Sequence, residues 1–300
     1  MQHAILGPGG VGGLIGVGLA SSGEAVTVVV RPDAVEEYPR SLSLNSDVFG
    51  TFTVPVSVTS KLFQAVDVLW IAVKATDLHT ALESVPTADQ VGAVVPLLNG
   101  IDHVALLRDR FGRDKVVPAT IGVSTERVAP GRIIWHSPFA KLSLSSAGRK
   151  SLRATVEELS RFGFECHFID DETTLMWSKL VFLAPHALST TAADAPIGKV
   201  MSDPGHAAEL RGLVVEACAV AVASGARVDT NDVWEQFKNL PADTRSSMQR
   251  DVEQGKIPEV DAIAGPILRG AEVFSIPVPT TRRVVQQILR QSTRASASNI

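Results

Sequence analysis

The chain has few cysteines and no excess of basic charge, and each shortage excludes a class of protein. Cys166 and Cys218 are the only cysteines among 300 residues. Two cysteines cannot build a disulfide framework and match no zinc-ligand spacing, so we expect two small buried residues in a reducing compartment, and no metal. Lys and Arg number 28 against 32 Asp and Glu, a net charge of −4. We therefore expect no nucleic-acid partner.

Long apolar runs are also missing. The longest stretches, such as 94–98 and 213–223, fall short of the ~18 to 20 residues that a membrane-spanning helix needs. The N-terminus has no basic flank and reaches Gly7 quickly, unlike a secretory signal. We therefore expect no membrane association and a cytoplasmic location. Apolar residues still make up 45% of the chain, enough for a sizeable core.

The first half of the chain alternates short apolar runs with helical stretches. Near-continuous apolar runs are typical of parallel strands that helices cover on both faces. They lie at 4–6, 25–30, 68–73, 93–97 and 116–118. The alternation predicts an α/β fold with a Rossmann-type, doubly wound parallel sheet. Further β-like runs at 42–44, 132–136 and 141–144 are interpreted as additions at a sheet edge.

The second half is helical. Apolar periodicity predicts helices at 171–190, 204–224, 233–240, 242–254 and 258–274. Asp203 is the expected N-cap before Pro204, and Pro258 is expected to open the last of these helices. At roughly 150 residues per domain the length predicts two domains. We place them at 1–169 and at 170–300, the second all-helical.

A glycine-rich segment opens the chain. Gly7-Pro8-Gly9-Gly10-Val11-Gly12 fits G-x-G-x-x-G, a weak signal by itself. Here an apolar strand precedes it and an apolar helix follows. The glycines permit a tight turn and close approach of a pyrophosphate, and the helix N-terminus offers N–H groups to the phosphates. The segment predicts a dinucleotide site, and a plain strand-to-helix turn is the alternative.

The choice of dinucleotide depends on the end of the second strand. An NAD site usually has Asp or Glu there, accepting hydrogen bonds from the ribose 2′-hydroxyl. This chain has Arg31, whose guanidinium matches a 2′-phosphate instead. We therefore expect NADP, with Asp33 nearby as a rival feature that would favour NAD.

Six segments, in order, resemble the ketopantoate reductase (2-dehydropantoate 2-reductase) family nearly from end to end. They are the glycine-rich segment, Arg31, Val73-Lys74, Leu98-Asn99-Gly100, Trp177-Ser178-Lys179-Leu180, and Ser246 to Asp251 followed by Glu259-Val260-Asp261. The resemblance implies an NADPH-dependent oxidoreductase that reduces a 2-oxo acid to a 2-hydroxy acid. It implies an NADP-binding domain at 1–169, a substrate and catalytic domain at 170–300, and a place in pantothenate biosynthesis.

The resemblance also assigns roles to single residues. Lys179 matches the family's general acid, which protonates the alkoxide left by hydride addition. A solvated helix lysine is the alternative for Lys179. Glu259 matches a glutamate near the substrate oxygen and the cofactor, and a carboxylate stabilised by the helix N-terminus after Pro258 is its alternative.

Four further residues match ligand contacts of the family. Ser247 matches a serine that binds the substrate carboxylate, and Lys74 and Asn99 match cofactor contacts. Asn99 also faces the substrate in the family, and Thr125 is aligned with a cofactor contact. The alternatives are a surface lysine for Lys74 and a simple turn for Asn99-Gly100.

The chain departs from the family where the substrate binds. Leu183 and Ala187 occupy positions four and eight residues after Lys179 where the family has asparagines, and Ile197 replaces a third. His186 lies near the same helix face and either supplies a polar group or is a core histidine. Pro185 is expected to kink the helix.

These observations lead to one function and two alternatives. Ketopantoate is the leading substrate. A family reductase for a bulkier or more apolar carbonyl compound is the first alternative, because Leu183, Ala187 and Ile197 are apolar, and we expect Leu183 and Ala187 to contact the substrate. A non-catalytic NADP-binding protein is the second. A homodimer is left open as the assembly.

Overall fold

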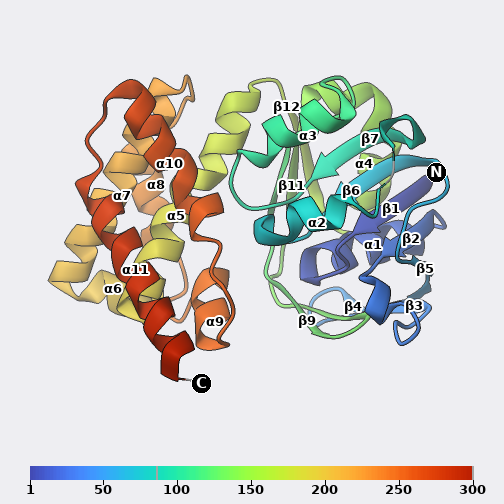
Figure 1. Cartoon of the computed structure of the whole chain (residues 1–300), viewed down its shortest axis with the longest axis horizontal. Helices are drawn as coiled ribbons and strands as arrows, with labels where there is room; N and C mark the ends of the chain where they lie inside the picture. Colours follow the sequence, from blue (N-terminus) through green and yellow to red (C-terminus); the bar gives the residue numbers. More distant parts are fainter. Residues whose placement is uncertain (86, 299–300) are drawn as a thin grey trace. The chain divides into compact units, whose positions relative to one another are not determined.

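The computed structural model describes residues 1–85 and 87–298, which form two compact units (Figure 1). The N-terminal unit comprises Met1–Leu98 and His103–Leu175, and the helical unit comprises Asn99–Asp102 and the chain from Met176 onward. The sequence places the division after residue 169, whereas the contacts place it after Leu175. Glu172 belongs to the N-terminal unit, where its carboxylate pairs with Arg108 at 2.8 Å.

The N-terminal unit is built on a parallel sheet with the strand order β5–β2–β1–β6–β7. Its strands are β1 (Gln2–Leu6), β2 (Ala25–Val29), β5 (Ser57–Thr59), β6 (Val66–Ile71) and β7 (Val91–Pro96). The sheet confirms the predicted Rossmann-type fold. The run 116–118 was expected to be a strand and is not one, since only Val116 forms an isolated bridge to Val94.

The additional β-like runs are strands, but they do not extend that sheet. One separate sheet contains β3 (Ser41–Ser46), β4 (Gly50–Pro55), β9 (Thr125–Ala129) and β10 (Arg132–Trp135). Another contains β8 (Ala119–Gly122), β11 (Lys141–Ser145) and β12 (Glu165–Ile169). The expectation of edge additions is therefore wrong, because β3 pairs with β10 in one separate sheet and β11 pairs with β8 and β12 in another.

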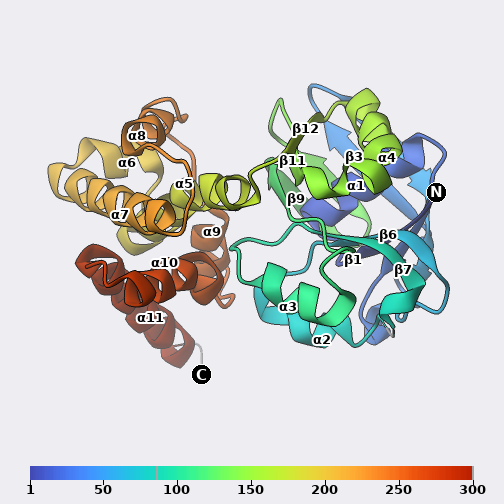
Figure 2. The ribbon, with the colours of Figure 1, turned by 90° about the horizontal axis from the view of Figure 1, so that it is seen from above.

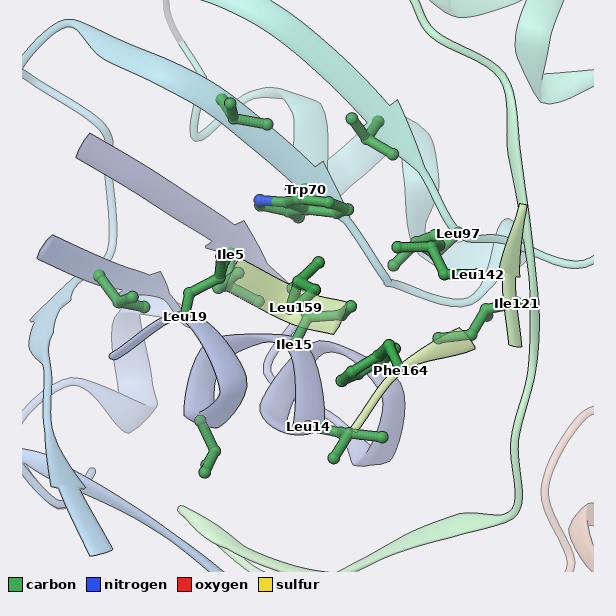
Figure 3. Packing of buried hydrophobic residues seen from close by; sticks show 14 of the residues in the cluster. Ile5, Leu14, Ile15, Leu19, Trp70, Leu97, Ile121, Leu142, Leu159 and Phe164 are labelled. Atoms are coloured by element: carbon green, nitrogen blue, oxygen red, sulfur yellow. The ribbon is translucent and has the colours of Figure 1, made fainter. Parts of the chain in front are cut away.

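Alternate side chains of each central strand enter opposite layers. Ile5 packs with Leu14 and Leu159 on one face, whereas its neighbour Leu6 packs with Leu107 on the other. The first face is covered by α1 (Gly10–Ser21) and α4 (Arg149–Phe162), and the second by α2 (Leu78–Leu82) and α3 (His103–Phe111). Figure 2 shows the two helical layers on either side of the strands, and Figure 3 shows the α1 side of the core around Trp70. Burial on both faces explains why the central strands β1, β6 and β7 are largely apolar.

Short 3₁₀ turns connect several of these elements. They are η1 (Pro32–Ala34), η2 (Ala75–Asp77), η3 (Ala88–Gln90) and η4 (Ser146–Gly148). Two of them directly follow strand ends that carry predicted cofactor residues, because Arg31 precedes η1 and Lys74 precedes η2.

The helical unit has its own hydrophobic core. Its helices are α5 (Glu172–Ala193), α6 (Ile197–Ser202), α7 (Pro204–Ala223), α8 (Thr230–Lys238), α9 (Ser247–Glu253), α10 (Val260–Phe274) and α11 (Pro279–Ser298). The start of α7 is confirmed, since Asp203 Oδ1 accepts from His206 N at 2.8 Å. The helix expected from Pro258 begins at Val260, and the one expected at 242–254 is shorter because Ser246 caps it.

The two cysteines lie in different surroundings. Cys218 is 2% exposed, as expected, whereas Cys166 on β12 is only half-buried. Within the described part of the chain, no group of three His, Cys, Asp or Glu side chains is arranged to hold a metal ion. None of the described helices combines the length and apolar character needed to cross a bilayer.

Candidate active site

The glycine-rich segment forms a tight turn between β1 and α1. Gly7 has φ +87°, and a Cβ at this position would lie 2.5 Å from Val73 Cγ1, so a larger residue fits neither the backbone nor the space. A Cβ on Gly12 would lie 2.4 Å from Gly7 O. The missing side chains therefore let α1 start directly against the strand ends.

The residues around the turn leave one side of it open. A Cβ on Gly9 would meet nothing within 4 Å, whereas one on Gly10 would lie 2.7 Å from Thr125 Oγ1. Tyr38 donates from its buried hydroxyl to Pro8 O at 3.4 Å. Gly10 and Val11 supply the first N–H groups of α1 beside this turn, and such groups suit a phosphate. The cradle fits the pyrophosphate of a dinucleotide.

Arg31 and Lys74 follow β2 and β6, whose carboxyl ends meet at the same sheet edge as that of β1. The Arg31 side chain is 79% exposed, and its Nη2 lies 3.6 Å from Asp77 Oδ2. A pair this exposed holds the guanidinium weakly. Its donors can therefore turn to a phosphate, and Asp33 lies close by in η1.

Three polar residues from distant parts of the chain meet in the helical unit. Lys179 Nζ on α5 donates to Asn99 Oδ1 at 3.3 Å. Asn99 Nδ2 then donates to Glu259 Oε2 at 3.4 Å. The amide therefore links an ammonium group to a carboxylate, with its oxygen toward the cation and its nitrogen toward the anion.

The surroundings of this trio alter the acidity of the lysine. Burial lowers the pKa of Lys179 from 10.5 to about 8, and the nearby charge of Glu259 opposes that shift. At neutral pH the group is still protonated, and it gives up its proton more readily than an ordinary lysine. This combination suits a general acid.

Glu259 is the residue before α10 and not a member of its first turn. Its side chain is not used to cap the helix, although its backbone oxygen accepts from Ile263 N at 3.1 Å. The residue is 9% exposed. The carboxylate thus faces Asn99, and the purely helix-stabilising alternative lacks the cap hydrogen bond that would support it.

Ser247 is the first residue of α9 and is exposed. Its neighbour Ser246 provides the cap, accepting from Gln249 N at 3.1 Å. Ser246 Oγ is also within 2.8 Å of Thr190 Oγ1 on α5. Since Ser246 caps the helix, the hydroxyl of Ser247 is not needed for capping, and the exposed side chain is accessible to a ligand.

Leu183, Ala187 and Ile197, which stand where the family has asparagines, lie in different environments. Ala187 and Ile197 are each 1% exposed and belong to the core of the helical unit. Leu183 is half-buried and is not among the residues of that core. Of the three, Leu183 is therefore the one whose side chain a ligand near Lys179 is best able to contact.

His186 lies in an aromatic environment. It is 7% exposed, and its ring centroid lies 5.9 Å from that of Phe182 and 6.3 Å from that of Phe237. Burial lowers the pKa of His186 to about 4, and the charge of Arg250 adds to this effect. The imidazole is therefore neutral at physiological pH, as expected for a core histidine.

Comparisons with known proteins cover almost the whole chain. Residues 3–147 match the family model described as ketopantoate reductase PanE/ApbA, and residues 171–291 match the model of its C-terminal domain. A 2-dehydropantoate 2-reductase of Caulobacter vibrioides is 28% identical over 94% of this chain and 96% of its own. The uncharacterized oxidoreductase YkpB of Bacillus subtilis is 27% identical over 95% and 96%.

Solved structures share the fold over the same length. A PanE/ApbA family ketopantoate reductase from Ralstonia eutropha has a TM-score of 0.87 and 25% identity, covering 99% of this chain and all of its own. A D-mandelate dehydrogenase solved with NADH and anilino(oxo)acetate has a TM-score of 0.87 and 19% identity over the same shares. At this identity the second likeness concerns the fold alone.

A Rossmann-type unit with a glycine cradle, joined to a helical unit with a buried lysine, defines the class of oxidoreductases that use a nicotinamide dinucleotide. Within that class, the chain belongs to the ketopantoate reductase family.

Sequence reasoning missed three residues that support these sites. Tyr38, the single tyrosine of the chain, contacts the glycine turn, and Asp102 and Arg269 pair beside Asn99. None of them lies in a recognisable motif. Asp102 could have been noticed because it lies three residues after Asn99. That spacing becomes informative only once Arg269 is known to be its partner.

Proposed function

We propose that this protein reduces a 2-oxo acid to the corresponding 2-hydroxy acid with NADPH, and that ketopantoate is its leading substrate. The observation that carries the proposal is the Lys179–Asn99–Glu259 trio, in which a lysine with a pKa of about 8 is hydrogen-bonded beside a carboxylate. A binding-only protein has no chemical need for such a group. The glycine cradle of the N-terminal unit supports a dinucleotide as the reductant.

Each residue of the trio has a distinct task in this reaction. When bound, a nicotinamide cofactor would supply the hydride that the carbonyl carbon accepts. The Lys179 ammonium stabilises the oxygen as it becomes an alkoxide, and then transfers a proton to it. Glu259 favours the protonated lysine, and Asn99 fixes the position of the Nζ atom. Ser247 is accessible for the substrate carboxylate.

A more apolar 2-oxo acid is the second candidate substrate, and Leu183 is the observation that favours it. This half-buried side chain lies one helical turn beyond Lys179. A leucine cannot pair with a substrate hydroxyl, and a polar group left without a partner weakens binding. The D-mandelate dehydrogenase of the same fold was solved with an oxo acid that carries an aromatic group.

A matched pair of substrates tests the function and its specificity together. Trimethylpyruvate differs from ketopantoate only by lacking the hydroxyl group, and NADPH oxidation reports turnover of both. We expect turnover of at least one, and a roughly 10² to 10⁴-fold loss of kcat in Lys179→Ala, the usual effect of losing a general acid. NADPH binding without turnover of any 2-oxo acid would leave a non-catalytic binding protein.

Arg31 yields a prediction about the cofactor. A guanidinium paired with the 2′-phosphate should make NADPH bind more tightly than NADH by about 1.5 to 3 kcal/mol. Arg31→Ala should remove most of that difference while leaving NADH binding unchanged. Fluorescence titration of both cofactors measures it. Equal affinities in the unsubstituted protein would mean that Arg31 does not contact the phosphate.

A further inference from the structure

Asn99 is the central member of the trio, and its own position needs an explanation. It contacts Lys179 and Glu259 at 3.3 and 3.4 Å, near the upper limit for a hydrogen bond. Both contacts therefore depend on where the backbone of residue 99 is held. That backbone belongs to a short segment, Asn99–Asp102, which joins the helical unit although its neighbours on both sides belong to the N-terminal unit.

The segment Asn99–Asp102 is anchored on α10. Gly100 has φ +84°, and a Cβ there would lie 2.2 Å from Ala262 O, so the backbone passes directly over the first turn of the helix. Ile101 packs against the core of the helical unit. The Asp102 carboxylate Oδ2 accepts from Arg269 Nη2, on the same helix.

Arg269 connects two carboxylates across α10. Its Nη1 donates to Asp261 Oδ1 at 2.8 Å, while its Nη2 pairs with Asp102. Asp261 lies two residues after Glu259, so the guanidinium joins the segment that carries Asn99 to the helix start that carries Glu259. The guanidinium presents its donors in a rigid planar fork, so one arginine holds both anions in fixed directions.

Gly265 makes room for this arrangement. A Cβ at Gly265 would lie 2.3 Å from Arg269 Nη2 and 2.7 Å from Asp261 Oδ1. The guanidinium therefore lies over a helical position that has no side chain. Because the clashing atoms are the ends of flexible side chains, a methyl group at residue 265 would displace the ion pairs and leave the helix itself intact.

We propose that Arg269, with Asp102 and Asp261, is a positioning device that holds Asn99 in reach of Lys179 and Glu259. This inference rests on the proposed function, since the trio is the catalytic group of that reaction. Arg269 touches neither substrate nor cofactor in this role. It acts through Asn99.

The kinetic test compares Arg269→Met with a matched control. Arg282→Gln, on α11, removes an ion pair to Glu272 of α10, the helix that also carries Arg269. The side chains of Arg269 and Arg282 are both 50% exposed. We expect Arg269→Met to lower kcat about tenfold or more, the scale of a small misplacement of a catalytic group, with NADPH affinity unchanged. Arg282→Gln should behave like the unsubstituted protein. Equal kcat in Arg269→Met and Arg282→Gln would overturn the proposal.

Two further variants separate positioning from folding. Gly265→Ala should reproduce the loss of kcat without lowering the melting temperature, because alanine favours a helix over glycine. In an Asn99→Ala background, Arg269→Met should cause no additional loss, since its effect passes through the amide. A full additional loss in that background would show that Arg269 acts in another way.

A readout independent of turnover distinguishes failure of this proposal from failure of the proposed function. In an Asn-Gly sequence, the Gly100 nitrogen can attack the Asn99 side-chain carbonyl carbon, expelling ammonia, and water then opens the ring to an acidic residue. The reaction requires local mobility, so loss of the anchor should accelerate it roughly twofold or more in Arg269→Met but not in Arg282→Gln. Mass spectrometry of the peptide measures it. If no 2-oxo acid is reduced, the deamidation rate alone tests the proposal. Equal deamidation rates in Arg269→Met and Arg282→Gln would show that Arg269 does not anchor the segment Asn99–Asp102.

Discussion

Lys179 combines two opposing influences in one side chain. Burial lowers its pKa to about 8, and Glu259 raises it against that effect. Because the protonated form is the one that donates, kcat/KM should fall as the pH rises above about 8, and a pH profile of the free enzyme measures this limb.

Removing the carboxylate should move that limb. Glu259→Gln removes the influence that raises the pKa of Lys179, so the fall in kcat/KM should begin at a lower pH than in the unsubstituted protein. Glu272→Gln, at the opposite end of α10, is the matched control and should leave the profile in place. An unchanged profile in Glu259→Gln would mean that another group titrates.

Leu183 carries the prediction about specificity. Leu183 is the one of the three replaced positions that lies outside the core, and Leu183→Asn restores the amide found there in the family. The substitution should raise the ratio of kcat/KM for ketopantoate to kcat/KM for trimethylpyruvate by about tenfold. Ala187→Asn places an amide in the core and should mainly lower stability. Steady-state kinetics on both substrates measure the shift. An unchanged ratio in Leu183→Asn would place the substrate hydroxyl elsewhere.

At the scale of the element, α11 depends on a residue of another helix. Glu216 on α7 is 7% exposed, and its carboxylate accepts from Thr280 N, Thr281 N and Thr281 Oγ1 at 2.7 to 2.8 Å. It therefore satisfies the first N–H groups of α11, which follow Pro279. Its negative charge also suits the positive end of the helix dipole.

Glu216→Gln should destabilise the protein by about 1 to 3 kcal/mol, because an amide can accept at only one end and leaves a buried donor unsatisfied. Glu272→Gln is the control, since Glu272 on α10 pairs with Arg282 on α11 and both side chains are at least half exposed. It should cost at most about 1 kcal/mol. Urea unfolding of the two variants measures the difference, and equal costs would contradict the capping role.

This dependence explains why some elements were predictable and others were not. The central strands and α7 carry their signals locally, in apolar runs and in Asp203-Pro204. The start of α11 is capped by a residue 64 positions away, and Ser246 of α9 is fixed partly by Thr190. The family motif located Asn99, Lys179 and Glu259, whereas Arg269 could not be found without its three-dimensional partners.

At the scale of the whole molecule, both units contain a buried histidine whose pKa is strongly lowered, His3 in the N-terminal unit and His186 in the helical unit. In the N-terminal unit, His3 is 1% exposed, and its Nδ1 accepts from Trp70 Nε1 at 3.3 Å. Burial is the main reason why the pKa of His3 falls to about 4, as it is for His186 in the helical unit. Protonation of either imidazole in the folded state would place a positive charge in a buried site that lacks the solvation of water.

The two histidines predict a loss of stability in mild acid. An unfolded histidine binds its proton near pH 6.5 and the folded ones only near pH 4, so the unfolded chain takes up more protons between these values. The free energy of unfolding should therefore fall as the pH drops from 6.5 to 4, by about 3 kcal/mol per histidine. His3→Gln should flatten the slope for the N-terminal unit and His186→Gln that for the helical unit, each followed by hydrogen exchange of peptides from its own unit. His206→Gln, on the exposed start of α7, controls for removing an imidazole. A slope that stays the same in both buried-site variants would assign the acid sensitivity to carboxylates instead.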